Sequence, residues 1–165
     1  MSHAIKTILF VCTGNVCRSP MAEYILRHRL GSDYSVSIRS AGLYAVEGAP
    51  ASEHAVQVLD EWGIDARPHK ARLLTDERMR EADLILVKTE AHRTDILQRR
   101  PEMEEKVRLL GSFGTRRDSF DIPDPAGLSL DMYRRTRDRI DEAVSDLILY
   151  LMEHGGLTRV TDLRG

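Results

Sequence analysis

A cysteine and an arginine six positions apart enclose a segment that is typical of phosphate chemistry. Cys12 and Arg18 are the ends of Cys-Thr-Gly-Asn-Val-Cys-Arg, which directly follows the apolar run 8–11. A loop of this kind between a strand and a helix turns successive backbone N–H groups inward, where the helix dipole favours an anion. Arg18 adds a planar pair of donors for two phosphate oxygens. We therefore expect this loop to bind a phosphoryl group.

The same field favours a thiolate, because a helix N-terminus and a guanidinium both stabilise the charged form of a thiol. We therefore expect Cys12 to be a nucleophile. Gly14 is expected to supply unusual backbone angles, with Ser19 as the N-cap and Pro20 at the first helical position. The alternative is a buried structural cysteine beside a surface arginine. The predicted phosphate-binding loop consists of Thr13, Gly14, Asn15, Val16, Cys17 and Arg18.

Cleavage of a phosphate monoester needs a second group that protonates the leaving oxygen. The segment 111–127 is the only extended stretch without clear periodicity, and it contains Asp118, Asp121 and Asp124. We choose Asp124, because the prolines on either side restrict its backbone. Asp121 is a rival and Asp118 a weaker one, and an aspartate in such a turn can also serve only a local hydrogen bond. The segment itself is expected to be a flexible active-site loop.

These groups predict a reaction in two steps. The Cys12 thiolate attacks phosphorus while Asp124 protonates the departing group, and the cysteinyl phosphate is held by Arg18 and the loop amides. Asp124 then deprotonates the water that hydrolyses this intermediate. The guanidinium and amides supply the positive field, and none of the six histidines has a zinc-ligand spacing. We expect no metal and no cofactor.

Segments with strand patterning alternate with helical ones, which predicts a three-layer α/β/α fold. Its centre is a four-stranded parallel sheet with helices on both faces and the phosphate-binding loop after the first strand. The expected strands are 7–11, 36–39, 83–87 and 106–110. The expected helices are 20–30, 53–62, 75–81, 90–98 and 129–153. In the last helix, apolar residues spaced by three and four form a core-facing stripe rather than a coiled-coil seam: Tyr133, Thr136, Ile140, Val144, Leu147 and Leu151.

The composition fits one domain over residues 1–165, with 42% hydrophobic and 30% charged residues. We take 155–165 as a candidate disordered tail. A net charge of −2 gives no general attraction to nucleic acid. No apolar stretch approaches the ~20 residues that span a bilayer, so no membrane contact is expected. Both cysteines lie in the loop, which is not a secreted disulfide framework and favours the cytoplasm. We expect a monomer or weak dimer.

The sequence resembles the low-molecular-weight protein tyrosine phosphatases of bacteria, which include a protein-arginine-phosphatase branch. The matching segments are 11–23, 40–42, 69–72 and 124–125 before a long helix, in the family's order, so the resemblance covers about residues 6–152. It implies a phosphorylated protein as substrate and inorganic phosphate as product. It also points to Asp124 as the general acid.

The resemblance implies roles for supporting residues. Ser19 is expected to donate its hydroxyl to the Cys12 sulfur. Asn15, Ser40 and His69 match positions whose side chains link to hold the strained loop. Cys17 matches a neighbour that forms a reversible disulfide with Cys12 and protects it from over-oxidation, and its alternative role is a small buried hydrophobe.

Substrate preference is the open part of the resemblance. Family members that act on phosphotyrosine carry aromatic residues after the Asp-Pro pair, whereas this chain has Ala126 and Gly127. Leu43 and Tyr44 are the candidates for the walls of the substrate slot, together with Ala126. Isoleucine at the position of Val16 is typical of tyrosine phosphatases and threonine of arginine phosphatases, while the segment 131–138 is closer to the arginine branch. We place phosphotyrosine first and phosphoarginine second.

Two other classes share parts of this pattern. Thioredoxin-coupled arsenate reductases have the same fold and loop, but they pass oxidation to further cysteines, and none follows Cys17 here. A phosphate-binding module without catalysis is the non-enzymatic alternative. Cys12, Arg18 and Asp124 argue against it, because a binder needs neither a nucleophile nor an acid.

Overall fold

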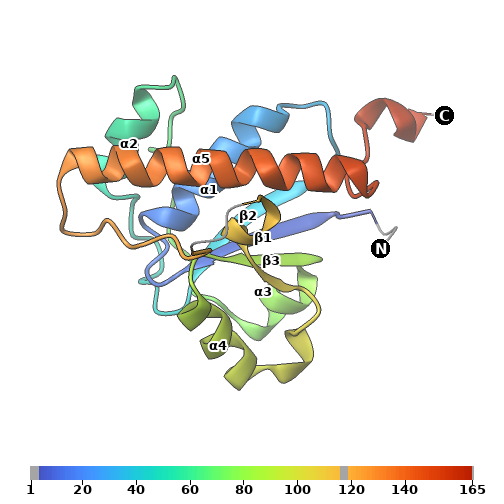
Figure 1. The fold of residues 1–165 in the computed structure, drawn as a ribbon, viewed down its shortest axis with the longest axis horizontal. Coiled ribbons are helices and arrows are strands. Elements are labelled where there is room, and N and C mark those ends of the chain that lie inside the picture. The colour runs from blue at the N-terminus through green and yellow to red at the C-terminus, as the bar shows by residue number, and fades with distance from the viewer. Residues whose placement is uncertain (1–3, 116–118, 165) are drawn as a thin grey trace.

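The computed structural model describes residues 4–115 and 119–164, and a parallel sheet forms its centre (Figure 1). The strand order is β2-β1-β3-β4, and every strand pair is parallel. The strands are β1 (Thr7–Cys12), β2 (Ser37–Gly42), β3 (Leu84–Val87) and β4 (Val107–Leu109). This sheet confirms the predicted α/β architecture.

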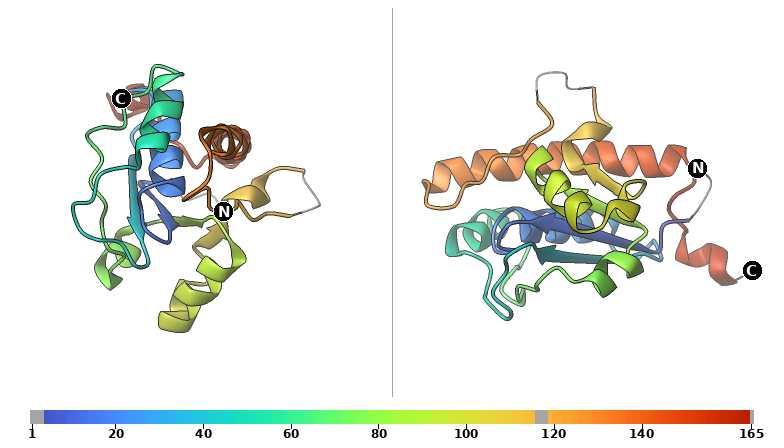
Figure 2. Two further views of the ribbon diagram at one scale, coloured as in Figure 1. Left: turned by 90° about the vertical axis from the view of Figure 1, so that its left-hand side faces the viewer. Right: turned by 90° about the horizontal axis from the view of Figure 1, so that it is seen from below.

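Helices cover both faces of the sheet, as Figures 1 and 2 show. One face carries α1 (Arg18–Leu30), α2 (Glu53–Asp60) and α5 (Leu130–Glu153), and the other carries α3 (Asp76–Glu81) and α4 (Glu90–Arg99). The described part of the chain also contains three short 3-10 helices: η1 (Pro101–Met103), η2 (Leu110–Phe113) and η3 (Val160–Arg164).

Strand β1 is buried on both faces, which explains its continuous apolar run. Ile8 and Phe10 join the core beneath α1 and α5, whereas Leu9 and Val11 join the core beneath α3 and α4. All six residues of the stripe predicted for α5 are buried, so this helix packs on the sheet and not in a coiled coil. The long helix thus fixes the segment before it over the carboxyl end of the sheet.

Several bounds differ from the prediction. Helix α1 begins at Arg18 and not at residue 20, and α2 ends at Asp60 and not at residue 62. Strand β2 continues to Gly42, in register with Cys12, where the sequence predicted an end at residue 39. The candidate disordered tail packs against the domain over its described residues. There the N–H of Ile5 donates to Gly156 O at 2.7 Å and that of Ser35 donates to Thr158 O at 2.8 Å.

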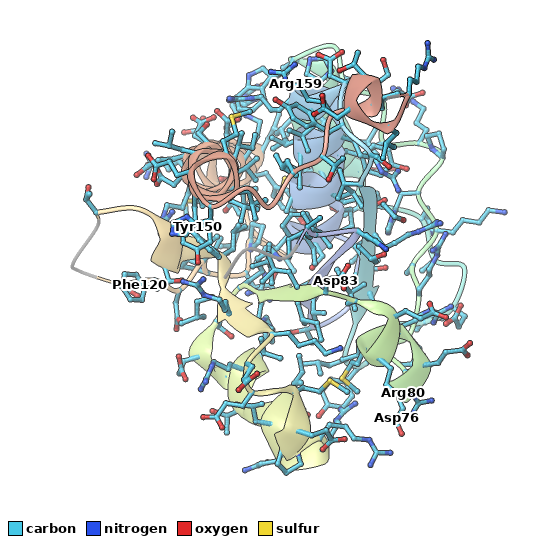
Figure 3. The ribbon with its side chains drawn as sticks, turned by 90° about the vertical axis from the view of Figure 1, so that its right-hand side faces the viewer. Asp76, Arg80, Asp83, Phe120, Tyr150 and Arg159 are labelled. Carbon is cyan, nitrogen blue, oxygen red and sulfur yellow. The ribbon has the colours of Figure 1, made fainter. Side chains whose placement is uncertain are left out.

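Asp83 stabilises the amino end of the sheet. It directly precedes β3 and is labelled in Figure 3. Its carboxylate accepts the backbone N–H groups of Lys6 and Thr7 at 2.8 and 2.9 Å. These bonds tie β1 to β3 before their pairing begins.

In the part of the chain that the structure describes, no helix has both the length and the apolar character needed to cross a membrane.

Candidate active site

The predicted phosphate-binding loop joins β1 to α1, with Cys12 as the last residue of the strand and Arg18 as the first of the helix. Its carbonyl oxygens are bound by donors outside the loop. The N–H groups of Leu43 and Tyr44 donate to Cys12 O and Thr13 O at 3.0 and 2.9 Å. Further along, His69 Nε2, Ser52 N and Met21 N bind the carbonyls of Asn15, Val16 and Cys17 at 2.7, 2.9 and 3.1 Å.

These outward bonds set the direction of the loop amides. In a planar trans peptide the N–H points away from the carbonyl of the preceding residue. Each carbonyl that is bound outside therefore turns the following N–H toward the inside of the loop, which applies to Thr13, Gly14, Val16, Cys17 and Arg18. Together with the positive end of α1, these amides form a cradle for an anion.

Arg18 closes the cradle from the helix side and is only 4% exposed. Its Nη1 donates to Ile122 O at 3.0 Å, and its Nη2 lies 3.6 Å from Asp124 Oδ2. Its Nε is buried and has no hydrogen-bond partner among the described residues. The guanidinium is thus held in place while keeping a donor for an oxyanion.

The unusual backbone angle of the loop lies at Asn15 and not, as predicted, at Gly14. Asn15 has φ 57°, and among the described residues it is the single non-glycine with positive φ. Its Oδ1 accepts the N–H of Arg72 at 2.9 Å, and His69 holds its carbonyl. A short amide side chain tolerates the left-handed region and bonds locally, so it replaces glycine there.

A carboxylate links the predicted supporting residues. Ser40 Oγ donates to Glu23 Oε1, and the same oxygen lies 4.0 Å from His69 Nδ1. Ser40, Glu23 and His69 are all buried, so the chain of contacts from Ser40 to Asn15 is shielded from water. The sequence analysis did not assign Glu23 a role, although it lies within the matched segment 11–23. A carboxylate at a core-facing position of the predicted helix could have indicated that it binds another buried polar group.

Gly42 holds the loop from the side of the sheet. A Cβ atom at this position would lie 2.8 Å from Asn15 N, 2.8 Å from Thr13 O and 2.9 Å from Gly14 C. The end of β2 therefore packs directly against the loop backbone, and a side chain would displace it.

Ser19 does not play the predicted capping role, because α1 begins two residues earlier than predicted, with Cys17 at its N-cap and no side-chain cap. The Ser19 hydroxyl is fully buried, and it has no hydrogen-bond partner in the described structure. The predicted bond to Cys12 is therefore not formed here. Because no side chain caps α1, the backbone N–H groups of its first turn stay free of a capping bond and face the loop.

Asp124 is the described aspartate that contacts the loop arginine. Its Oδ1 accepts the N–H of Ala126 at 3.0 Å, while Oδ2 faces Arg18, and 47% of its side chain is exposed. Asp121 instead accepts the N–H of Glu90 at 2.9 Å, at the start of α4. Asp118 lies outside the described residues. Backbone bonding of Ile122 to Lys88 O at 2.7 Å anchors the segment that carries Asp124.

Cys17 lies on the core side of the loop, at α5. Its Sγ is 3.2 Å from the Tyr133 hydroxyl and 3.5 Å from Ser52 Oγ. Burial raises the pKa of the Cys17 thiol. Burial and the contact with Cys17 raise the pKa of Tyr133 to about 12. Tyr133 was predicted only as a core residue, so its polar contact with the loop was missed.

Two further titratable groups lie behind the loop and were not predicted. His92 Nε2 lies 3.0 Å from Thr13 Oγ1, and burial lowers the pKa of His92 to about 4. Lys88 directly follows β3 and is fully buried. Neither Lys88 nor His92 stands at a fixed spacing from Cys12 that would identify it in the sequence as part of the site.

No group of three or more His, Cys, Asp or Glu side chains within 4–115 and 119–164 is arranged to hold a metal ion.

The residues predicted as slot walls divide into two groups. Tyr44 is 64% exposed, and its hydroxyl donates to Asp95 Oδ2 at 2.8 Å. Ala126 is exposed too. Leu43, however, is 4% exposed and packs into the core beneath α3 and α4, because the alternation of β2 turns it inward after Ala41. The prediction that Leu43 forms a wall is therefore wrong.

Comparison with known proteins gives consistent matches. The family model described as "Low molecular weight phosphotyrosine protein phosphatase" matches residues 7–156. A probable low molecular weight protein-tyrosine-phosphatase, EpsP, of Ralstonia nicotianae is 41% identical over 140 residues, which are 85% of this chain and 92% of that protein. The YwlE arginine phosphatase of Geobacillus stearothermophilus has a structure with a TM-score of 0.83 at 39% identity, covering 90% of this chain and 94% of that one.

A further solved structure bears on the chemistry of the loop. It is a YwlE mutant in which the active-site serine is phosphorylated, and it matches with a TM-score of 0.81 at 38% identity. The match covers 88% of this chain and 95% of that chain. In that protein, a side chain of the active site accepts the phosphoryl group.

Proposed function

The chain belongs to the low-molecular-weight phosphotyrosine protein phosphatases, and on that premise we propose that it hydrolyses phosphotyrosine in proteins with Cys12 as the nucleophile. The observation that carries this proposal is the cradle itself. Its carbonyls are bound outside, its amides are turned inward, and Cys12 lies at its base. Such a loop presents donors to a phosphoryl group and a thiol to its phosphorus.

In the first step, the Cys12 sulfur forms a bond to phosphorus as the bond to the tyrosine oxygen breaks. Asp124 supplies the proton that this oxygen takes up. Its Oδ2 lies 3.6 Å from Arg18 Nη2 at the mouth of the cradle, and its side chain is partly exposed, so a bound substrate can reach it. Arg18 and the loop amides stabilise the charge on the three phosphate oxygens.

In the second step, water attacks the cysteinyl phosphate, and the Asp124 carboxylate takes a proton from this water, which returns Asp124 to its acid form. The sulfur leaves as a thiolate, which the field of α1 favours. The products are the dephosphorylated protein and inorganic phosphate. The chain from Ser40 through Glu23 and His69 to Asn15 supports the loop throughout.

Tyr44 supports phosphotyrosine as the substrate. It follows β2 beside the loop, with its N–H bound to Thr13 O and its hydroxyl bound to Asp95, while 64% of the residue is exposed. A ring held in this way offers a face on which a substrate ring can stack. Phosphoarginine is the second candidate, because exposed Ala126 and Gly127 follow Asp124 where an aromatic wall would stand.

Hydrolysis of phosphotyrosine and phosphoarginine peptides, measured side by side, tests both substrates. Cys12→Ser is the blank and is expected to be inactive on each. The proposal predicts a higher kcat/KM for phosphotyrosine, and Tyr44→Ala should reduce that preference. A higher kcat/KM for phosphoarginine would assign the chain to the second candidate. Binding of phosphate without turnover of either would indicate a binding module.

The location and assembly of the protein are part of the same proposal. A reducing cytoplasm suits an enzyme with a working thiolate and two cysteines that are both free. All of the groups assigned here come from one chain, which fits a monomer or weak dimer as the active form.

A further inference from the structure

Lys88 is a buried cation that the reaction described above does not use. It is 0% exposed, and its Nζ donates one hydrogen bond, to Leu86 O at 3.2 Å. The ammonium also lies 4.8 Å from the centre of the Phe10 ring. No ion pair of the described residues includes Lys88. An ammonium buried without a carboxylate disfavours folding, and a methionine would fill similar space without that cost.

The register of the sheet places this cation beside the nucleophile. Val11 pairs with Val87, so Cys12, the last residue of β1, and Lys88, the first residue after β3, directly follow a paired position. Side chains alternate along a strand, so Cys12 projects to the same face as Phe10. The contact of Nζ with the Phe10 ring places Lys88 on that face as well. The cation therefore lies behind the base of the cradle, next to Cys12.

We propose that Lys88 is a positioning residue for the nucleophile: its buried ammonium favours the Cys12 thiolate and strengthens the positive field that the phosphoryl group enters. It acts from behind the loop and does not touch the substrate. Its effect therefore goes through Cys12, in contrast to Arg18, which faces the cradle. This inference rests on the proposed role of Cys12 as the nucleophile.

The charges around Lys88 support this role. Burial lowers its pKa to about 7, the negative charge of Cys12 acts in the opposite direction, and Arg18 of α1 lowers it further. His92 of α4 also experiences the Lys88 charge. Of these three neighbours, Cys12 is the one that carries negative charge. The thiolate and the ammonium therefore stabilise each other, and their titrations are coupled.

Titration of the Cys12 thiol tests the proposal without any substrate. In a Cys17→Ser background, the ultraviolet absorbance of the thiolate and the rate of alkylation by iodoacetamide both follow Cys12 ionisation. Lys88→Met is expected to move the midpoint of this titration up by about one pH unit, the lower end of the effect of a nearby opposite charge. Activity is expected to fall most on the acidic side of the pH profile.

Lys106→Met is the matched control. The Lys106 ammonium also donates to backbone carbonyls, at 2.9 Å to Ala82 O and 3.3 Å to Arg80 O, but at the other end of the sheet. This variant is expected to leave the Cys12 titration unchanged. If Lys88 served only packing, Lys88→Met would lower activity equally at every pH and leave the thiol titration in place, which would overturn the proposal.

A reciprocal measurement does not depend on the folding of Lys88→Met. The proton of Lys88 can be followed by NMR in protein with carbon-labelled lysine. In Cys12→Ser, which lacks the thiolate, Lys88 is expected to lose its proton at lower pH than in the parent protein. Equal Lys88 titrations in the two proteins would refute the coupling. A Cys12→Ser protein that still hydrolysed its substrate would instead refute the proposed function.

Discussion

Gly42→Ala offers a direct test of how the loop is held. The new Cβ would lie 2.8 Å from both Asn15 N and Thr13 O, whereas ordinary contact begins at 3.4 Å. These neighbours are backbone atoms, so no side chain can rotate away. The loop must therefore retreat from β2 by the difference, about 0.6 Å, or the strand must move by as much.

A shift of this size acts on the amides that would bind the phosphoryl group. Because a misplacement of about 1 Å can cost about 10²-fold in rate, we expect kcat/KM to fall by about 10- to 100-fold. Overpacking should also reduce the free energy of unfolding by about 1–3 kcal/mol. Steady-state hydrolysis of an aryl phosphate and urea unfolding measure these two effects, and inhibition by inorganic phosphate measures the expected loss of phosphate affinity.

Gly63→Ala is the control for Gly42→Ala. Gly63 has φ +72° and nothing within 4 Å of an added Cβ, so its substitution strains the backbone without contacting the loop. It should lower stability by about 1 kcal/mol and leave kcat/KM unchanged. Wild-type kcat/KM and phosphate affinity in Gly42→Ala would refute the argument that contact with β2 positions the loop.

Three further predictions follow from the site. Asp124→Ala should lower turnover of phosphotyrosine by about 10² to 10⁴, with a smaller loss for an activated aryl phosphate, and this pattern in Asp121→Ala instead would reassign the acid. Mild peroxide should produce a Cys12–Cys17 disulfide detectable by mass spectrometry, whereas sulfinic or sulfonic acid at Cys12 would contradict the protective role. Burial lowers the pKa of His92 to about 4 from the ordinary 6.5, so between these values the unfolded chain binds the proton that the folded chain excludes. Stability should therefore fall as pH falls through this window, and urea unfolding of His92→Gln should show a weaker dependence; equal dependence would exclude this residue as the cause.

The local pattern around the loop was sufficient to predict strand, loop and helix. An apolar run before Cys12 and a helical stripe after Arg18 are properties of neighbours in the sequence, and the structure has both elements. The same reasoning chose Gly14 for the unusual backbone angle, because glycine is the usual residue there. The structure assigns it to Asn15, since bonds from residues 69 and 72 hold that conformation, and their approach depends on the fold.

Residues whose contacts are distant in sequence could not be predicted in this way. Leu43 was predicted as a wall of the substrate slot because it follows the matched segment 40–42, whereas the structure packs it with Ala41 in the core beneath α3 and α4. Lys88 and His92 lie near the loop only because β3 pairs with β1 and α4 packs on β3 and β4. Their neighbours in the sequence are those of an ordinary strand end and helix start, so nothing local predicted that either residue lies at the site.

The contact between Cys17 and Tyr133 joins residues that are 116 positions apart. On the ribosome, the loop with its nucleophile emerges early, while Tyr133 and Asp124 follow much later. A nascent chain therefore carries a cysteine-containing loop without the helix that supports it or the acid that completes it. By the proposed mechanism, activity is therefore expected only after Asp124 and α5 have been synthesised and have packed against the loop.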